Sequence, residues 1–356
     1  MNTTAKLWGL SWIQLAFRTS NLRVGAAHEL PCALITTIPF AEKEAIPLRL
    51  LQAAGIDYTI NPLGRKITEM ELSEMIANFD ILIAGTEPIT EQVLARAQQL
   101  KLISRIGIGL ESVDLLAAHR RGMQVCFTPD APAPAVAEFT IGLMLAVLRQ
   151  VPSPNAQMQA GVWQRHFGWR MAACTVGIIG ASRIGSRVIQ HLQEFGPPCI
   201  RVNDIAREPT LASCYPLQWA SKEEMFREAD VISLHLPLTH NTRNLIRTEQ
   251  LLLMKPDAIL IYTAHGGIIH EQELAAALRA GHLGGAAIDL FERKPYSGEL
   301  AGIERCVLTA HMGSMSVDCR TRMEIEATQE AVRFVSGQQL LNSVPPEEYE
   351  VKRQSE

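Results

Sequence analysis

The chain has 356 residues, of which 47% are hydrophobic and 20% are charged, and this length predicts two domains with their own cores. The formal net charge of −4 gives no basic field, so we expect no nucleic-acid partner. No apolar run approaches the ~20 residues of a membrane span, and we expect neither a membrane association nor a bound metal. Seven scattered cysteines without CxxC spacing indicate reduced thiols and a cytoplasmic location.

The N-terminal segment is the one region that resembles a targeting signal. Lys6 precedes an apolar stretch at residues 7–17, an arrangement faintly similar to a secretory signal peptide. Gln14 within this stretch and Arg18 directly after it argue against export. We therefore expect an N-terminal extension helix.

The first third of the chain alternates apolar runs with amphipathic segments, which is the pattern of a small α/β domain with a parallel sheet. The proline-rich segment 128–134 predicts a hinge, and the apolar helix 136–149 leads into the next domain. We expect the earlier helices at residues 41–54, 68–78 and 91–100, and the strands at residues 32–38, 58–61, 81–84, 102–106 and 125–127.

The most informative stretch lies near the middle of the chain. An apolar run at residues 175–179 predicts a buried parallel strand, which enters the turn Gly180-Ala-Ser-Arg-Ile-Gly185. An amphipathic helix at 186–195 and a second strand at 199–202 follow. This βαβ order is the unit that places a dinucleotide pyrophosphate at a helix N-terminus.

Two residues refine this interpretation. Asp204 lies 19 residues after Gly185, close to the ~20 expected for an acid that binds the adenosine ribose. Because this acid would repel a 2′-phosphate, we expect NAD rather than NADP, although Arg201 and Arg207 flank it. Ser182 replaces the middle glycine of the usual GxGxxG string and either donates its hydroxyl to phosphate or loosens binding.

Four further apolar runs extend the second sheet, at residues 231–236, 258–263, 286–291 and 306–309. The last helix, at 318–336, is long enough to return to the first domain. We therefore expect an α/β fold of two Rossmann-like domains with parallel sheets. An NAD-binding Rossmann domain of residues 132–312 is inserted into a flavodoxin-like substrate domain of residues 1–131 and 313–356, and residues 345–356 form a charged, frayed tail.

Several strings in this order resemble the D-isomer-specific 2-hydroxyacid dehydrogenases, particularly the phosphoglycerate-dehydrogenase-like branch. The likeness runs from about Cys32 to Leu341 and includes the glycine turn and the strings at 105–114, 128–138, 230–239, 254–256, 285–291 and 308–314. The resemblance implies a homodimeric oxidoreductase in which NAD and substrate meet in the cleft between the two domains. It also implies hydride transfer between nicotinamide and a small anionic 2-keto or 2-hydroxy acid.

The resemblance also assigns residues to the two ligands. His235 is expected to line the cofactor cleft, with a satisfied core histidine as the alternative. Asp289 lies near the C-terminus of an expected strand, and for this reason we expect it to accept a hydrogen bond from the nicotinamide amide rather than to cap a helix. The backbone amides of Gly107, Ile108, Gly109 and Leu110 are expected to bind the substrate carboxylate. The expected cofactor-binding set is Gly180, Ser182, Arg183, Ile184, Gly185, Asp204, His235, Pro237, Thr242, Thr263, Ala264, Asp289, Gly313 and Ser314.

The catalytic positions depart from the family pattern. The reaction needs a cation on the substrate carboxylate and carbonyl, an imidazole that exchanges the hydroxyl proton, and a carboxylate that keeps this imidazole protonated. The family uses Arg, His and Glu, whereas this chain keeps only the histidine, His311, and has His265 and Lys294 at the other two positions. His265 is only partly charged at neutral pH, and an ammonium at Lys294 disfavours the imidazolium form of His311.

Two compensations and two functions stay open. In the first compensation, Lys294 binds an anionic group of the substrate. In the second, Glu292 reaches His311, because strand alternation would project residues 292 and 294 to one side. The chain is then either an active NAD-dependent oxidoreductase with an altered site or a non-catalytic relative that binds NAD or a metabolite. We expect any homodimer contact at the helix 136–149 and the following segment 156–163.

Overall fold

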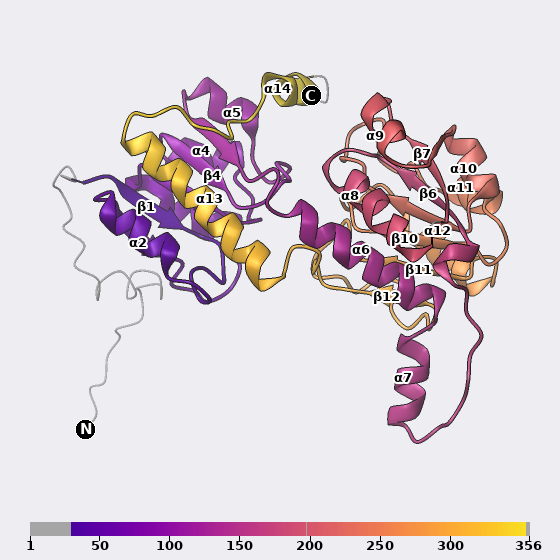
Figure 1. Ribbon diagram of the computed structural model, residues 1–356. Coiled ribbons are helices and arrows are strands. Elements are labelled where there is room, and N and C mark those ends of the chain that lie inside the picture. The colour runs from indigo at the N-terminus through magenta and orange to yellow at the C-terminus, as the bar shows by residue number, and fades with distance from the viewer. Residues whose placement is uncertain (1–29, 197, 354–356) are drawn as a thin grey trace, which may run out of the picture. The chain divides into compact units, whose positions relative to one another are not determined.

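The computed structural model describes residues 30–196 and 198–353, and these form two compact units (Figure 1). The first unit comprises residues 30–128 and Glu324–Tyr349, and the second comprises Pro129–Met323. The second division falls inside the last long helix, whereas the sequence places it at 312/313. The start of that helix is tied to the second unit because Cys319 Sγ donates to the backbone oxygen of Ala131 at 3.6 Å. The signal-like segment 7–17 and the expected extension helix lie outside the described residues.

The first unit contains a five-stranded sheet in which every pairing is parallel, with the strand order β2-β1-β3-β4-β5. This order is the flavodoxin-like arrangement. Three of the strands are buried along their whole length; β1 and β3 are continuous apolar runs, whereas β4 also buries Ser104 and Arg105. The strands are β1 (Cys32–Ile35), β2 (Asp57–Ile60), β3 (Ile81–Ala84), β4 (Leu102–Arg105) and β5 (Gln124–Phe127).

Two helices of the first unit begin at well-formed side-chain caps. Thr68 and Glu71 make a reciprocal capping box before α3, and Thr90 caps α4, so the first N–H groups of both helices have acceptors. The helices are α2 (Ile46–Ala53), α3 (Glu69–Met75) with the 3₁₀ turn η1 (Ile76–Asn78), α4 (Glu91–Arg96), α5 (Leu115–Arg120), α13 (Val317–Val335) and α14 (Pro346–Arg353).

The expected frayed tail at 345–356 is wrong for most of its length, because α14 forms there. Proline at the first helical position and Glu347 and Glu348 in the first turn favour helix initiation. The ring of Tyr349 lies 5.5 Å from that of His119 on α5, so the helix has a packing partner.

The second unit contains a seven-stranded parallel sheet in the order β12-β11-β10-β9-β6-β7-β8. The chain proceeds from β6 to β8 in one direction and from β9 to β12 in the other, so the order reverses between β6 and β9. Ligands of open α/β sheets bind at such a switch point, outside the carboxyl ends of the strands. The strands are β6 (Thr175–Ile179), β7 (Cys199–Asn203), β8 (Gln218–Trp219), β9 (Val231–Leu234), β10 (Ile259–Tyr262), β11 (Gly285–Ile288) and β12 (Cys306–Leu308).

Adjacent residues of the central strands pack into opposite cores. Ile232 and Leu260 belong to one buried cluster, and their neighbours Val231 and Ile261 belong to another, as the two-residue period of a strand requires. Both faces of this sheet are therefore covered, and the predicted α/β class with two parallel sheets is confirmed. The helices are α6 (Ala133–Leu148), α7 (Pro152–Gln159), α8 (Arg183–Leu192), α9 (Pro209–Cys214), α10 (Lys222–Glu228), α11 (Thr248–Leu253) and α12 (Glu271–Arg279), with 3₁₀ turns η2 (Met171–Ala173) and η3 (Gln193–Phe195).

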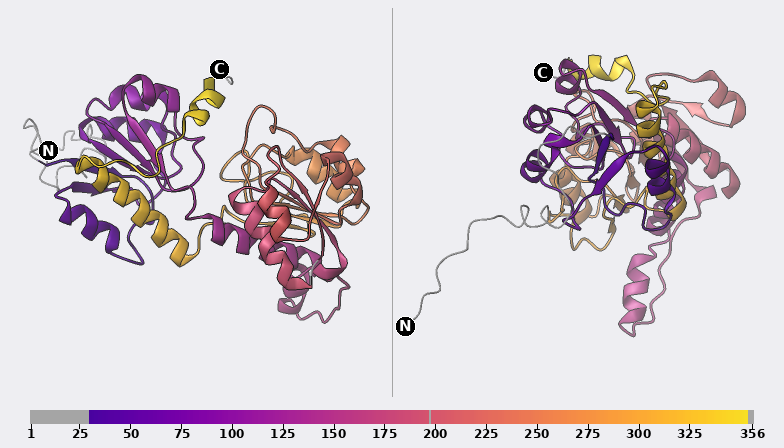
Figure 2. Two further views of the ribbon diagram at one scale, coloured as in Figure 1. Left: turned by 45° about the horizontal axis from the view of Figure 1, so that its top comes forward. Right: turned by 90° about the vertical axis from the view of Figure 1, so that its left-hand side faces the viewer.

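Helix α7 stands away from the sheet of the second unit, as Figure 1 and the right-hand view of Figure 2 show. None of its residues is buried. No single helix in the described part of the chain is long and apolar enough to cross a membrane; α6 and α7 meet the length and composition test only as a pair, bent by 64°. No group of three or more His, Cys, Asp or Glu side chains arranged to hold a metal ion occurs among the described residues.

Candidate active site

The glycine turn lies at the switch point of the second sheet. Gly180 has φ of 91°, a left-handed conformation that favours glycine. A Cβ added to Gly180 would lie 2.5 Å from the backbone oxygen of His235, just after β9, and one added to Gly185 would lie 1.9 Å from the backbone oxygen of Gly180. The two glycines therefore let α8 approach β6 and β9 closely, as a dinucleotide-binding turn requires.

Asp204 follows β7 and reaches back to the glycine turn. One carboxylate oxygen accepts from the N–H of Ala181 at 2.7 Å, and the other accepts from the N–H of Ala206 at 2.9 Å. The acid thus stands beside the turn, which is where a ribose-binding carboxylate belongs. The flanking arginines have partners of their own, since Arg201 pairs with Glu228 and Arg207 lies 6.0 Å from the ring centre of Trp219.

Residues 182–184 form the start of α8. Ser182 is the N-cap, but its hydroxyl makes no capping hydrogen bond within the described residues, so the first-turn N–H groups remain available to an anion. Arg183 Nε donates to Asp130 Oδ1 at 2.8 Å, which ties the turn to the hinge segment. Ile184 packs against the core beneath α6.

His235 is buried directly after β9. The residue is 7% exposed, its Nε2 lies 2.9 Å from Ser233 Oγ, and its Nδ1 has no hydrogen-bond partner among the described residues. Burial lowers the pKa of His235 to about 3, so the ring is neutral. An orphaned buried nitrogen at the switch point favours a ligand-facing role over that of a satisfied core histidine.

The loop after β9 is held by its own hydroxyl. Thr242 Oγ1 donates to the backbone oxygen of Pro237 at 2.6 Å and accepts from the N–H of Thr239 at 2.7 Å. Both predicted cofactor residues of this loop, Pro237 and Thr242, therefore belong to one closed turn.

The turn after β10 is fixed at both ends. The hydroxyl of Tyr262 accepts from the N–H of Ile268 at 3.0 Å, and Thr263 Oγ1 lies 2.8 Å from Thr140 Oγ1 on α6. Thr263 is buried and Ala264 nearly so. These contacts fix the position of the backbone that leads to the next residue, His265.

His265 and Lys294 lie on segments that touch. A Cβ added to Gly266 would lie 2.2 Å from the backbone oxygen of Phe291, so the turn that carries His265 packs against the start of the segment that carries Lys294. The rings of Phe291 and Tyr296 stack with centroids 4.1 Å apart. This stack closes the short loop on which Lys294 lies.

Asp289 organises the loop that carries His311. One oxygen of this buried carboxylate accepts from Thr309 Oγ1 at 2.5 Å and from the N–H of Met312 at 2.7 Å, while the other accepts from the N–H of Gly313 at 3.0 Å. Its backbone oxygen accepts from the N–H of His311 at 3.0 Å. His311 has φ of 57°, which is uncommon outside glycine and persists only where the surroundings enforce it.

His311 and Lys294 are in direct contact. Lys294 Nζ lies 3.2 Å from His311 Nδ1. The half-buried imidazole is thus paired with a cation donor in place of a carboxylate acceptor.

The alternative that Glu292 reaches His311 by strand alternation is not supported. Strand β11 ends at Ile288 and residues 292–295 lie in bends, so the two-residue period does not apply. The carboxylate of Glu292 pairs with Arg243 at 3.2 Å, and the backbone N–H of Glu292 donates to the carboxylate of Glu271 at 2.8 Å.

The expected substrate loop, Gly107 to Leu110, lies in the first unit after β4. Gly107 has φ of 129°, and its N–H donates to Thr128 Oγ1 at 2.6 Å. The guanidinium of Arg105 fills the space beside Gly107, where an added Cβ would lie 1.7 Å from a guanidinium nitrogen. The loop is therefore built over a buried cation, but the Gly107 amide is engaged within the protein.

Three residues that position the predicted site residues were not themselves predicted. Thr140, Thr309 and Asp130 position predicted residues through hydrogen bonds across 123, 20 and 53 positions of the chain. Asp130 and Thr309 lie within the strings 128–138 and 308–314 of the family resemblance, but these strings do not specify their hydrogen-bond partners. A hydroxyl such as Thr140 in a largely apolar helix needs a partner when it is buried.

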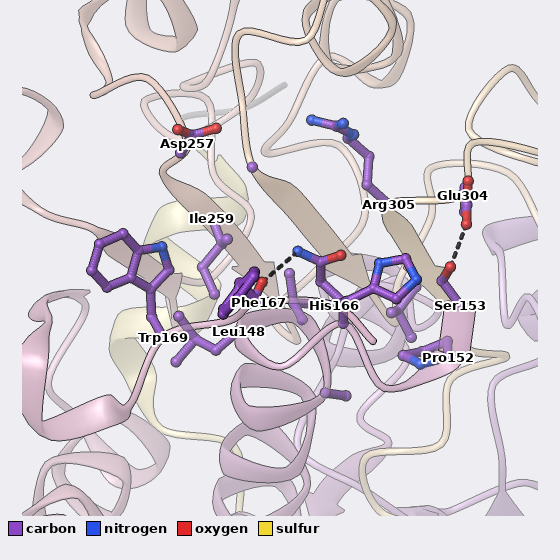
Figure 3. Close-up of a pocket in the computed structure, with 15 residues that line it drawn as sticks. Leu148, Pro152, Ser153, His166, Phe167, Trp169, Asp257, Ile259, Glu304 and Arg305 are labelled. Carbon is purple, nitrogen blue, oxygen red and sulfur yellow. Dashed lines mark hydrogen bonds between the residues drawn. The ribbon is translucent and has the colours of Figure 1, made fainter. Parts of the chain in front are cut away.

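A separate cavity of about 450 Å³ lies elsewhere in the second unit (Figure 3). Its lining includes Ile259, Gly284 and Arg305, which stand at the amino ends of β10, β11 and β12. Ligands of parallel α/β sheets bind at the carboxyl ends. This cavity is therefore not the candidate active site.

Comparison with known proteins gives a consistent result. Residues 141–313 match the sequence model described as D-isomer specific 2-hydroxyacid dehydrogenase, NAD binding domain. The chain is 33% identical over 295 residues to a hydroxypyruvate reductase of Thermotoga maritima, covering 81% of this chain and 94% of that protein. It is 34% identical over 283 residues to a D-3-phosphoglycerate dehydrogenase of Methanocaldococcus jannaschii, covering 78% of this chain and 54% of that protein.

A solved structure supports the same fold. The crystal structure of a Thermus thermophilus protein is similar with a TM-score of 0.81 and 32% sequence identity, covering 88% of this chain and 100% of that chain. The chain therefore spans about half of the phosphoglycerate dehydrogenase that it matches and nearly all of the other two proteins.

Proposed function

We propose that this chain, which belongs to the D-isomer-specific 2-hydroxyacid dehydrogenase family, transfers hydride between NAD and a small anionic 2-keto or 2-hydroxy acid, using an altered set of catalytic residues. The names of its relatives, hydroxypyruvate reductase and D-3-phosphoglycerate dehydrogenase, support this substrate class.

One observation carries the proposal that the site is active. The loop of His311 is held by four hydrogen bonds to Asp289, and the imidazole contacts Lys294, at the carboxyl edge of the sheet that also carries the glycine turn. A left-handed conformation outside glycine costs of order 1–3 kcal/mol, and the hydrogen bonds to Asp289 hold His311 in it at this edge of the sheet.

The described residues fit a dinucleotide. The tight turn at Gly180 and Gly185, the uncapped start of α8 at Ser182 and the carboxylate of Asp204 suit a pyrophosphate and a ribose. The orphaned Nδ1 of His235 offers one further polar contact. When bound, NAD supplies or accepts the hydride.

The protein's own side chains must manage the proton and the charge. His311 exchanges the proton of the substrate hydroxyl. His265 and Lys294 lie on the touching segments after β10 and β11, and we assign them to the carbonyl and carboxylate oxygens of the substrate. Lys294 supplies a positive charge to this pair of side chains.

The test is turnover of a panel of 2-keto acids and keto-phosphonates with NADH, followed by its absorbance. We expect the wild type to reduce at least one member and His311→Ala to lose ~10²–10⁴-fold in kcat. A wild type that NADH stabilises against heat but that reduces none of the panel would favour the non-catalytic binding function. His265→Arg combined with Lys294→Glu would then create turnover of ordinary 2-keto acids.

We also propose a homodimer formed through residues 151–169, which we call the arm. Its large apolar side chains are exposed, among them Trp163 at 82%, Phe167 at 99% and Trp169 at 63%. Phe167 and Trp169 flank the cavity of Figure 3. Contiguous exposed apolar and aromatic side chains are typical of protein interfaces, and a second copy of the chain is the partner that we propose.

A cytoplasmic location is proposed on the state of the thiols. All seven cysteines are free, and burial raises the pKa of Cys126 and Cys306 to about 12. Buried thiols of this kind are unreactive and suit a reducing compartment.

A further inference from the structure

The contact between Lys294 and His311 fixes which ring nitrogen carries the proton. A lysine ammonium has three donors and no acceptor. At 3.2 Å from Nζ, His311 Nδ1 is therefore the acceptor, and the proton of the neutral ring lies on Nε2. A carboxylate at position 294 would impose the opposite arrangement, because it accepts from an Nδ1–H.

A neutral ring with its proton on Nε2 cannot reduce a ketone alone. If Nε2 gives its proton to the developing alkoxide and Nδ1 gains none, the ring becomes an imidazolate. An imidazolate is a far stronger base than the neutral imidazole that remains when an imidazolium is the acid. A donor at Nδ1 removes this obstacle when it can also release its proton. The Lys294 ammonium is such a donor, since lysine shifts its protonation readily, whereas arginine does not deprotonate in proteins.

We propose that Lys294 is the proton reservoir of the reaction and that His311 relays its proton. During reduction of the 2-keto acid, C2 gains the hydride, the Nε2–H bond breaks as the new O–H bond forms, and the Nζ–H bond breaks as an Nδ1–H bond forms. The step leaves a neutral lysine amine and a neutral imidazole. One solvent proton taken up at Nε2, with return of the Nδ1 proton to the amine, restores the starting state. The inference rests on the proposed function and specifies how this site works.

Several other charged or titratable groups lie on the segments that carry this pair or pack against them. Arg243 and Glu292 form an ion pair at 3.2 Å, and Glu271 accepts the N–H of Glu292. The carboxylate of Asp289 accepts three hydrogen bonds from the His311 loop. Arg293 lies beside Lys294 in the chain, and His265 lies on the turn that packs against their segment.

The local fold supports a fixed geometry for the relay. The stacked rings of Phe291 and Tyr296 close the loop of Lys294, and Asp289 holds the loop of His311. Both partners thus lie on loops that are anchored on either side of the 3.2 Å contact.

Three variants separate the relay from a positioning role. Lys294→Met removes the donor, Lys294→Arg keeps a donor and a positive charge that cannot release its proton, and Lys101→Arg is a matched control because Lys101 also makes one ionic hydrogen bond, to Asp80 at 2.9 Å. The ring tautomer is read from the ¹⁵N NMR spectrum of histidine-labelled protein without cofactor, in which His311 is identified by its loss in His311→Gln.

We expect wild type, Lys294→Arg and Lys101→Arg to show the Nε2–H tautomer of His311, and Lys294→Met to lose this preference. We expect kcat for reduction at pH 8 to fall ~10²-fold in both Lys294 variants, and to stay at the wild-type value in Lys101→Arg. The Lys294→Met variant should partly recover as the pH falls toward 6, because no cation at position 294 then opposes an imidazolium, which supplies the proton.

Each result decides the matter. A Lys294→Arg enzyme with the wild-type kcat and pH profile would overturn the relay and leave Lys294 a positioning residue, while the proposed function would stand. An Nδ1–H tautomer in the wild type would overturn the relay as well. A wild type that turns over no member of the panel would overturn the proposed function and the relay together.

Discussion

The charge around His311 is where this chain differs most from the arrangement that its family resemblance implies. An arginine and a glutamate contribute no net charge together, whereas His265 and Lys294 contribute one positive charge when His265 is neutral. The contact at 3.2 Å puts that charge beside His311 Nδ1. A site of this kind favours substrates with an extra anionic group, which is why the test panel includes keto-phosphonates.

Asp204 is the residue that decides between the two dinucleotides. We predict that NADH raises the melting temperature of the wild type by more than NADPH does, because the carboxylate accepts ribose hydroxyls and repels a 2′-phosphate. Asp204→Ala should narrow the difference, and Glu208→Ala, which changes an exposed acid four positions later in the sequence, should preserve it. The assignment fails if NADPH stabilises the wild type as much as NADH does.

His235 gives a prediction about acid stability. Its pKa in the folded protein, about 3, lies below the ordinary value of 6.5, so the unfolded chain binds the proton first as the pH falls. The stability contributed by the neutral ring is therefore complete above pH 6.5 and decreases as the pH falls toward 3, by up to about 1.4 kcal/mol per pH unit.

His235→Gln keeps a polar side chain near Ser233 but cannot take up a proton. Urea unfolding at a series of pH values should therefore show a shallower loss of stability in the variant than in the wild type between pH 6 and 4. Parallel curves would contradict the buried, neutral state of His235.

At the scale of elements, apolar runs predicted which strands exist better than where they end. The expected strands 231–236 and 286–291 stop at Leu234 and Ile288. Leu290 and Phe291 continue the apolar run but lie in a loop that packs into the core. Periodicity cannot distinguish such a loop from a strand, because both bury their side chains.

The candidate site also has parts that the sequence predicts and parts that it does not. The glycine turn and Asp204 were predictable because their spacing follows from one βαβ unit. The proximity of Lys294 to His311 was expected only through the family resemblance, which puts residue 294 at the position of the glutamate. The 3.2 Å contact between Nζ and Nδ1 depends on two irregular loops, whose paths are set by Asp289 and by the stack of Phe291 on Tyr296. No local pattern encodes those contacts.

The junction of α8 with β6 can be tested by paired glycine substitutions. In Gly185→Ala the new Cβ would meet the backbone oxygen of Gly180 at 1.9 Å, so we expect a destabilisation of about 1–3 kcal/mol and loss of thermal stabilisation by NADH. Gly142→Ala, at an exposed position within α6 where nothing lies within 4 Å of the new Cβ, should instead stabilise by about 0.5–1 kcal/mol. Urea unfolding and thermal shift with NADH measure both effects, and equal behaviour of the two variants would refute the close approach of α8.

At the scale of the whole molecule, the arm presents exposed apolar side chains. Helix α7 has no buried residue, and Trp163, Phe167 and Trp169 are largely exposed. Burying such side chains removes apolar surface from water at roughly 25 cal/mol per Å², which is a driving force for association that a single copy of the chain leaves unused.

We therefore predict that the wild type is a dimer in solution and that Trp163→Ser combined with Phe167→Ser shifts it toward monomer. Leu252→Ser is the matched control, because Leu252 on α11 is also largely exposed, at 65%, but lies outside the arm. Size-exclusion chromatography with light scattering over a range of protein concentrations gives the mass of each. Because the arm variants remove no buried side chain, their thermal unfolding at high dilution, where the wild type also dissociates, should match that of the wild type. A dimer that persists in the double variant would place the interface elsewhere, and a wild type that is monomeric at every concentration would refute it.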